Sequence, residues 1–202
     1  MAVISGGTTL IDNGALDAGV STGDLILLST QTASSSSSIT FTSGIDSTYD
    51  SYVFKYINIH PASVAQLQFN MSTDSGSNYN VTKTSTAFNP YHNESDDTPG
   101  VIYRTAWDLA ESTSDQIMAQ EVGNGNDECA SGFLQIFRPS STTFVKHFIG
   151  TTQYYQTFGQ TGSFGVHYAG YGNTTSAVDA IIFKMSTGNI DAGTFKMYGV
   201  KS

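Results

Sequence analysis

Short segments that alternate apolar with polar residues recur along this chain and constrain its fold more than any other feature. The segment SITFTS at 38–43 sets Ile39 and Phe41 on one face and threonines on the other, which is the two-residue period of a half-buried β-strand. AQLQFNMST at 65–73 repeats the pattern, with Leu, Phe and Met opposite Gln, Gln and Asn. About ten or more such segments follow at a spacing of roughly 8–12 residues, which is typical of a β-sandwich or barrel.

The composition favours strands over helices. Charged residues make up only 12% of the 202 residues, against roughly 25% in an average protein. Helix faces normally carry Lys, Glu and Arg, whereas this chain is rich in Ser, Thr, Asn and Gly. The length suffices for one sizeable domain, and no repeat of fixed period is found. We therefore expect an all-β fold, a jelly-roll-like β-sandwich with a short extended N-terminal arm.

Individual segments predict where the strands and loops lie. SYVFKYINIH at 51–60 is apolar on both faces and is expected to be a central strand ended by Pro61. TFKMYGV at 194–200 is expected to be an integral strand of the sheet, because a free terminus would be polar and would fray. The only helix-like pattern, at 106–123, predicts at most one or two turns after Ser114, and residues 89–100 are expected to be a long polar loop.

The first 33 residues differ from the rest. A short apolar pair is followed by Gly, Asp, Ala and Ser, and then by a stronger strand at 25–28. This segment is too thin to form a core, so we expect an attachment arm at 1–33 and the sandwich at 34–202, with the serine run 34–38 as a loop or flexible joint. The arm would dock on the domain behind it or on a neighbouring subunit. Its contact residues would be Leu10, Ile11, Leu25 and Leu27.

Charge and hydropathy exclude several classes of protein. The net charge is −9 and no cluster of Lys and Arg occurs, so no nucleic acid partner is expected. The sequence contains no run of about 18 apolar residues, so we expect no membrane span. The N-terminus does not resemble a secretory signal. Cys129 is the only cysteine, so no disulfide within the chain is expected.

No motif predicts catalysis, a metal or a cofactor. The four histidines lack the spacing of a metalloprotease, and no G-x-S-x-G sequence occurs. Two acidic loops leave two interpretations open, because clustered carboxylates on Asn- and Gly-rich turns either bind Ca²⁺ or are simply solvated. The same acids would have to serve a polysaccharide depolymerase, the weakest alternative. They are Glu94, Asp96, Asp97, Asp127 and Glu128.

An aromatic-rich stretch at 153–173 is the most suggestive candidate site. Its aromatics alternate with Gly, Gln and Thr, a composition typical of lectin-like sugar sites and equally of sandwich cores and subunit interfaces. We expect core and interface roles, and glycan binding stays open. The candidate residues are Tyr154, Tyr155, Phe158, Tyr168 and Tyr171.

Both ends of the chain carry recurring motifs. GGTTLIDNGALD, the run from LILLSTQTASSSSSITFTS to NIHPAS, and IIFKMSTGNIDAGTFKMYGV together resemble structural proteins of tailed bacteriophages, particularly those of marine hosts. The resemblance covers residues 5–70 and 177–200 and marks strands and turns, with no catalytic residue to transfer.

The resemblance implies a non-enzymatic virion component that is made and assembled in the host cytoplasm. It would be a capsid decoration or cement protein that binds other capsid or tail proteins as a homo-oligomer, a trimer among the options. The alternative is a tail or head fibre, or a receptor-recognition module, that binds host surface glycans.

Overall fold

The computed structural model describes residues 3–5, 8–12, 15–16, 25–156 and 161–201, and these form β-strands and connecting loops. Every strand pairing is antiparallel. The large sheet has eight strands in the order β4 (Leu25–Ser36), β15 (Ile190–Val200), β6 (Ser51–Pro61), β11 (Ala130–Phe137), β12 (Lys146–Gln156), β13 (Gly162–Gly172), β8 (Lys83–Asn93) and β9 (Gly100–Tyr103). The small sheet has four, in the order β10 (Gln116–Val122), β7 (Ala65–Ser72), β14 (Ala180–Met185) and β5 (Ile39–Phe41).

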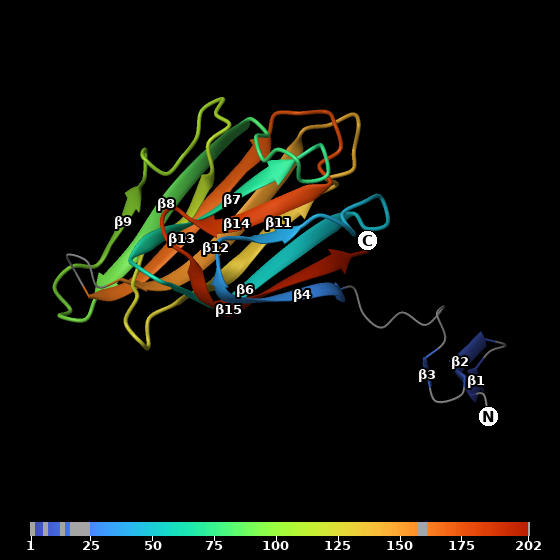
Figure 1. The fold of residues 1–202 in the computed structure, drawn as a ribbon, viewed down its shortest axis with the longest axis horizontal. Helices are drawn as coiled ribbons and strands as arrows, with labels where there is room; N and C mark the ends of the chain where they lie inside the picture. The colour runs from blue at the N-terminus through green and yellow to red at the C-terminus, as the bar shows by residue number, and fades with distance from the viewer. Residues whose placement is uncertain (1–2, 6–7, 13–14, 17–24, 157–160, 202) are drawn as a thin grey trace.

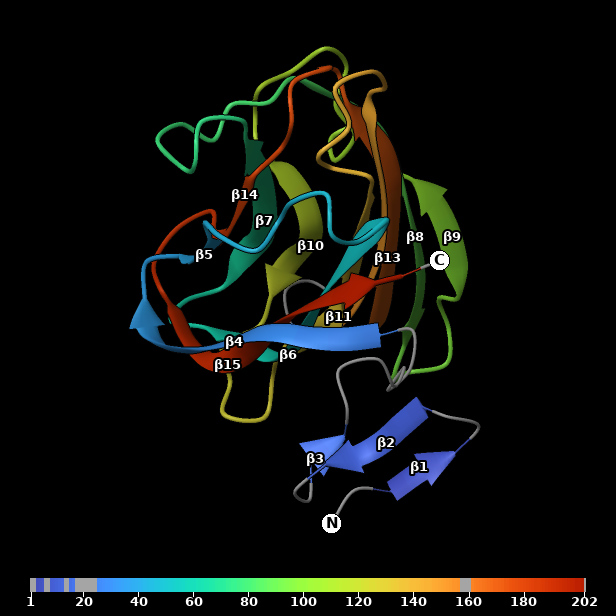
Figure 2. The ribbon, with the colours of Figure 1, turned by 90° about the vertical axis from the view of Figure 1, so that its right-hand side faces the viewer.

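The two sheets lie face to face (Figures 1 and 2), which confirms the predicted all-β sandwich. No helix occurs among the described residues, so none of them forms a helix able to cross a membrane.

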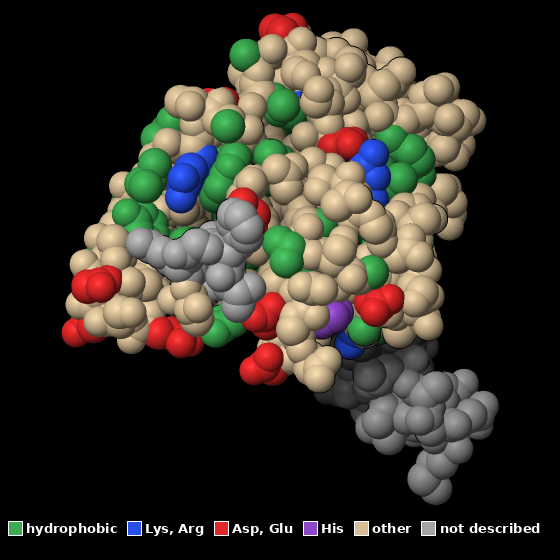
Figure 3. Space-filling view, turned by 60° about the vertical axis from the view of Figure 1, so that its left-hand side comes forward, with side chains coloured by type: hydrophobic (Ala, Val, Ile, Leu, Met, Phe, Trp, Pro, Cys, Tyr) green, Lys and Arg blue, Asp and Glu red, His purple; other side chains and the backbone are tan. Residues whose placement is uncertain are grey.

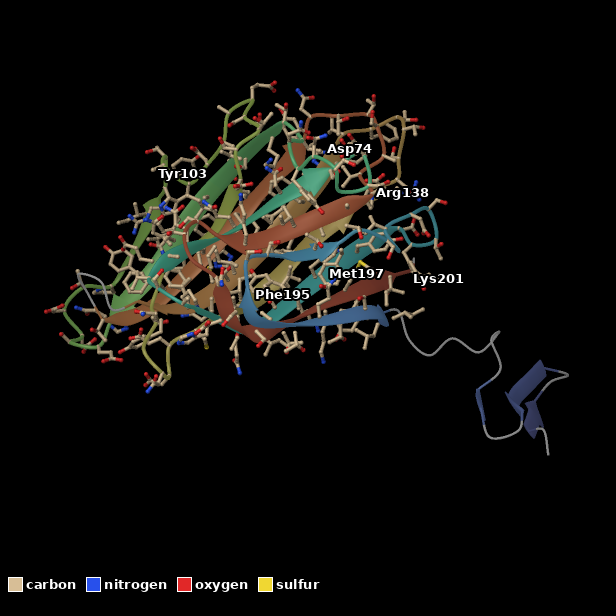
Figure 4. The ribbon with its side chains drawn as sticks, in the orientation of Figure 1. Asp74, Tyr103, Arg138, Phe195, Met197 and Lys201 are labelled. Atoms are coloured by element: carbon tan, nitrogen blue, oxygen red, sulfur yellow. The ribbon has the colours of Figure 1, made fainter. Side chains whose placement is uncertain are left out.

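Aromatic side chains fill the space between the sheets. Phe183 of β14 lies 5.1 Å from Phe195 of β15 and 5.7 Å from Phe54 of β6, measured between ring centroids. Phe69 of β7 packs edge-on against Phe148 of β12 at 5.3 Å. These rings are fully or almost fully buried, and Figure 4 shows Phe195 inside the sandwich. Such rings are among the largest contributors to a core because each removes a large apolar area from water.

The predicted central and closing strands are confirmed. β15 lies between β4 and β6, with Phe195 opposite Gln31 on one side and Tyr56 on the other. The C-terminal strand is therefore held by backbone hydrogen bonds along both edges. β6 lies between β15 and β11 and ends at Pro61, which has no N–H to donate to a further rung.

The predicted arm boundary at residue 33 differs from the observed one. β4 pairs with β15 from Leu25 to Ser36, so residues 25–33 and most of the serine run belong to the sandwich. The hydroxyl-rich sequence forms a strand because its backbone groups find partners in β15, which the local sequence does not reveal.

The part of the chain before residue 25 forms a separate small sheet where the structure describes it. β1 (Val3–Ser5), β2 (Thr8–Asp12) and β3 (Ala15–Leu16) pair in that order and share no pairing with the sandwich, as Figure 2 shows. The prediction of an extended arm therefore needs correction, because these strands pair with one another. Leu10 and Ile11 lie in β2, and their side chains are outside the described part of the structure.

Two further segments differ from the sequence prediction. The helix-like segment at 106–123 contains no helix; its second half is β10, which pairs with β7. Met118 faces the core from this strand, and the apparent helical spacing reflected residues of two different segments.

The polar loop is shorter than the predicted range 89–100, because β8 continues to Asn93. Asn89 of this strand points into the protein, where its side-chain amide donates a hydrogen bond to the Gly165 carbonyl.

We predict that Phe195→Ala destabilises the protein by about 3–5 kcal/mol, because it leaves a cavity where three strands meet. Urea denaturation followed by circular dichroism measures this change. Lys196→Ala, at the neighbouring outward position, is the matched control and is expected to change the free energy of unfolding by less than about 0.5 kcal/mol. An equal effect of both variants would contradict the assignment of Phe195 to the core.

Candidate functional site

The outer face of the large sheet carries one carboxylate on its main strands, Asp191, which follows buried Ile190 at the start of β15 and accepts a hydrogen bond of 2.8 Å from the Ser35 hydroxyl. Alternate residues of a strand point to opposite faces, so the register of the buried residues identifies the outward ones. On β6, β8, β11, β12, β13 and β15 these are, in chain order, Val53, Lys55, Ile57, Thr84, Thr86, Phe88, Pro90, His92, Ser131, Phe133, Gln135, Phe137, His147, Ile149, Thr151, Gln153, Tyr155, Ser163, Gly165, His167, Ala169, Tyr171, Asp191, Thr194, Lys196, Tyr198 and Val200. The chain has 17 Asp and Glu residues, yet these positions include one of them, Asp191, and two lysines.

Large apolar and aromatic side chains gather on this face over β8, β11, β12 and β13. Exposed fractions are 44% for Phe88, 38% for Phe133, 42% for Phe137 and 47% for Ile149. We define these four residues together with His147, His167 and Tyr171 as the outer-face cluster.

Strand register places the cluster residues side by side. Phe133 lies opposite Thr151, which lies opposite His167, which lies opposite Phe88. The His167 ring stacks on Phe88 with 4.8 Å between ring centroids, and His167 Nδ1 lies 3.1 Å from the Thr151 hydroxyl. Two outward rows further along, His147 lies opposite Tyr171 and contacts its ring edge-on. The cluster therefore extends across β11, β12, β13 and β8.

A hollow with a volume of about 490 Å³ opens in this face between Phe137, Ile149 and Tyr171. A second hollow of about 600 Å³ adjoins it and is bounded by Phe144, the most exposed phenylalanine of the described residues. Phe137 and His147 line both hollows. The two hollows therefore form one groove where β11 ends and β12 begins.

Neighbouring core residues fix the side chains of the cluster. Leu134, Ile136 and Phe148 are buried on the inner face, which forces Phe133, Phe137 and Ile149 outward by strand alternation. The sequence contains a sign of this arrangement that our prediction missed. GFLQIFRP and TFVKHFIG carry large apolar residues on both faces, more than one buried face requires.

The strand β4 forms an open edge of the large sheet. Among the strands that the structure describes it pairs only with β15, and its sequence LILLSTQTASSS contains neither a charged residue nor a proline. Leu25 and Leu27, predicted as contact residues of the arm, are exposed on this edge strand. Natural proteins usually protect edge strands with charges, prolines or short length, so β4 is suited to contact another chain.

The predicted aromatic site separates into residues on two faces. Tyr154 and Tyr168 are buried core residues, which agrees with the core role expected for part of this stretch and rules these two out as glycan or interface contacts. The Tyr168 hydroxyl lies 3.2 Å from that of Tyr56, and burial raises the pKa of Tyr168 well above its usual value. Both side chains lie inside the sandwich and cannot contact a ligand in solution.

The remaining predicted aromatics do not form one patch. Tyr155 and Tyr171 point outward, but Tyr171 lies opposite His147, eight residues along β12 from Tyr155, which corresponds to roughly 27 Å. Phe158 lies outside the described residues. Of the five candidates, Tyr171 alone belongs to the outer-face cluster.

The histidines have separate local roles. His60 Nε2 lies 3.0 Å from the Gly125 carbonyl, and His92 Nε2 lies 3.0 Å from Asp96 Oδ1. His147 and His167 contact Tyr171 and Phe88 as described above. In the part of the chain that the structure describes, no three His, Cys, Asp or Glu side chains come together as metal ligands.

The acidic loops use their carboxylates to form turns. Glu128 Oε2 accepts a hydrogen bond of 2.7 Å from the Gly125 N–H and is itself buried. Hydrogen bonds from Thr98 and Asn93 lower the pKa of Asp97. Cys129 is half-buried, and burial raises the pKa of its thiol, the opposite of what an activated nucleophile needs.

Comparison with known protein families, with curated proteins and with solved structures finds no match to this chain.

We predict that Tyr168→Ala lowers the stability of the fold strongly and that Tyr155→Ala leaves it almost unchanged. Loss of the buried Tyr168 ring is expected to cost about 3–5 kcal/mol, whereas Tyr155→Ala is expected to change stability by less than about 0.5 kcal/mol. Thermal unfolding of both variants beside the unmodified protein measures the difference. A large loss of stability in Tyr155→Ala would show that this side chain also supports the fold.

Proposed function

We propose that this chain is a non-enzymatic structural protein of a bacteriophage particle, attached to the exterior of the capsid as a decoration protein. In this role it associates with further copies of itself through the outer-face cluster. The observation that carries the proposal is the combination of large exposed aromatics with the absence of carboxylates on the four strands of the cluster, β8, β11, β12 and β13.

Charge supports contact through this face. Each copy carries a net charge of −9, so two copies repel one another through most of their surface. The outer face is the place where they approach at least electrostatic cost, because β8, β11, β12 and β13 present no carboxylate and the neighbouring strands present Lys55 and Lys196. Interface cores are depleted of charged residues and enriched in aromatics, and single chains rarely expose large contiguous apolar patches. Figure 3 shows another side of the molecule, where hydrophobic side chains form small separate patches among polar surface and scattered Asp, Glu, Lys and Arg side chains.

Further support comes from the edge strand β4 and from the sequence motifs. An open, uncharged edge adds a strand from a neighbour through backbone hydrogen bonds. The motifs at both ends of the chain resemble structural proteins of tailed bacteriophages. A virion location and assembly in the host cytoplasm follow from this resemblance.

We predict that Phe137→Asp combined with Ile149→Asp converts an oligomer into a monomer. Two carboxylates placed in the cluster would face those of the partner copy in an apolar contact, which costs several kcal/mol. Size-exclusion chromatography with light scattering measures the mass. The control is Val64→Asp, an exposed apolar residue in the loop that follows β6. A monomeric unmodified protein would contradict self-association through this face.

We predict that the chain is found on the outside of purified particles of the virus that encodes it. Mass spectrometry of intact particles would detect its peptides, and a density map would locate the sandwich on the capsid. Absence from the particle, together with no binding of the purified chain to capsids, would contradict the virion role.

The groove gives a specific reason to keep a second candidate, a fibre or receptor-recognition module that binds host glycans. Its lining includes Tyr171 and the hydroxyl-bearing residues Thr84 and Thr86, and rings beside hydroxyls suit sugar rings. Binding on a glycan array that is lost in Tyr171→Ala, with an unchanged melting temperature, would favour this alternative over the decoration protein.

A further inference from the structure

Two of the eight cationic residues of the chain are buried between the sheets. Lys83 and Lys146 have an exposed fraction of 0%, and strand register places them on either side of Gly172. Burial of an ammonium group is costly unless it is paired. Lys146 Nζ donates to the carbonyls of Phe144 and Thr174 at 2.6 and 3.1 Å, and so ties two loops together.

Lys83 has a different environment. Its Nζ lies 2.6 Å from Asn70 Oδ1 and 2.7 Å from the Val81 carbonyl oxygen. Asn70 has an exposed fraction of 1% and belongs to β7 of the small sheet, whereas Lys83 belongs to β8 of the large sheet. This contact therefore bridges the two layers of the sandwich in a site closed to water.

The Asn70 amide is held and polarised from every side. Its Oδ1 accepts a second hydrogen bond of 2.9 Å from the Met71 N–H. Its Nδ2 donates to Asp115 Oδ1 at 2.9 Å and to the Thr113 carbonyl at 3.0 Å. The other oxygen of Asp115 lies 2.8 Å from Lys184 Nζ, which anchors the carboxylate beside the amide.

We propose that Lys83 and Asn70 join covalently, forming an amide bond between Nζ and the side-chain carbonyl carbon of Asn70 with release of ammonia. Because Nζ lies 2.6 Å from Oδ1 and a C=O bond measures about 1.23 Å, the carbonyl carbon lies at most about 3.8 Å from the amine. Reacting atoms held about 3–3.5 Å apart gain much of the rate advantage of an intramolecular reaction. Nucleophile and electrophile are thus already adjacent.

The step balances without any further reactant. The lone pair of the neutral Lys83 amine forms a bond to the Asn70 carbonyl carbon, and the Met71 N–H stabilises the negative charge that develops on Oδ1. Once bonded, Nζ shares the carbonyl carbon with Nδ2, which already donates to Asp115 Oδ1 at 2.9 Å, so the Asp115 carboxylate is next to both nitrogens, takes the proton that Nζ releases and delivers it to Nδ2. The bond from the carbonyl carbon to Nδ2 then breaks, ammonia leaves and the carbonyl reforms. Nothing is oxidised or reduced, and Asp115 ends in its starting form.

Burial also favours the reactive form of the amine. It lowers the pKa of the Lys83 amine to about 8, against the opposing charge of Asp115, so a fraction of the amine is neutral near neutral pH. The bond would replace a buried charge by a neutral amide and remove the cost of desolvating that charge. It would also fix the two sheets to one another beside the loop at 73–82.

Intact-protein mass spectrometry of the purified, full-length chain tests the proposal and does not depend on the proposed virion role. The expected mass is lower than that of the sequence by one ammonia. Tandem spectra of a protease digest are expected to contain one branched peptide that links Lys83 to Asn70. A mass equal to that of the sequence, or an ammonia loss located at another residue such as Asn124 before Gly125, would overturn the proposal.

Three variants distinguish the reaction from a structural contact. Lys83→Met removes the nucleophile and Asp115→Asn removes the proton carrier while keeping a side chain of equal size. Both are expected to have the full mass of their sequences. Lys146→Met makes the same change at the other buried lysine and is expected to retain the ammonia loss. An ammonia loss that persists in Lys83→Met would overturn the proposal, and if that variant does not fold, the linked peptide of the unmodified chain still decides.

Discussion

The contact of the small sheet with the inner face of the large sheet is the interaction on which the rest of the structure depends. Phe183 of β14 packs against rings from β6 and β15, and Phe69 of β7 packs against rings from β12 and β13. Two side chains of the small sheet thus fix four strands of the large one. Since strand residues alternate between faces, each buried ring also determines which neighbour points outward. The outer-face cluster is therefore a consequence of the same register that builds the core.

The two faces of the large sheet differ in the charged residues that they carry. The inner face takes Lys83 and Lys146 into the protein, and on the outer face β8, β11, β12 and β13 carry no carboxylate although the chain is strongly acidic. On the outer face, Lys55 lies directly opposite Lys196, a like-charge pair that is unfavourable in an isolated sheet. Lys55 lies 5.4 Å over the Tyr198 ring, which offsets part of this repulsion.

Local pattern predicted the strands well and their partners poorly. SYVFKYINIH and TFKMYGV were recognisable because alternation and apolar content are properties of the segment itself. The strand β4 was misjudged because its hydroxyl-rich part forms a strand only through β15, which is more than 150 residues away in sequence. Tyr154 and Tyr155 look alike in sequence, and only the register decides that one is core and the other surface. The contact of Lys83 with Asn70 depends on how the two sheets stack, so neither residue is distinctive in the sequence.

The site of that contact also explains how a sheet of four strands covers one of eight. Beside β10, the loop at 104–115 takes the place of a further strand. The Arg104 guanidinium lies 4.6 Å over the buried Trp107 ring and binds Asn89 of β8, and the backbone of this loop bonds to Lys83 and Ser85. Loops hold such a position less firmly than strands, because fewer of their backbone groups are paired. Asp115 ends this loop next to Asn70, so Lys83, Asn70 and Asp115 fasten together β8, β7 and the loop at the place where the small sheet alone would leave the core open.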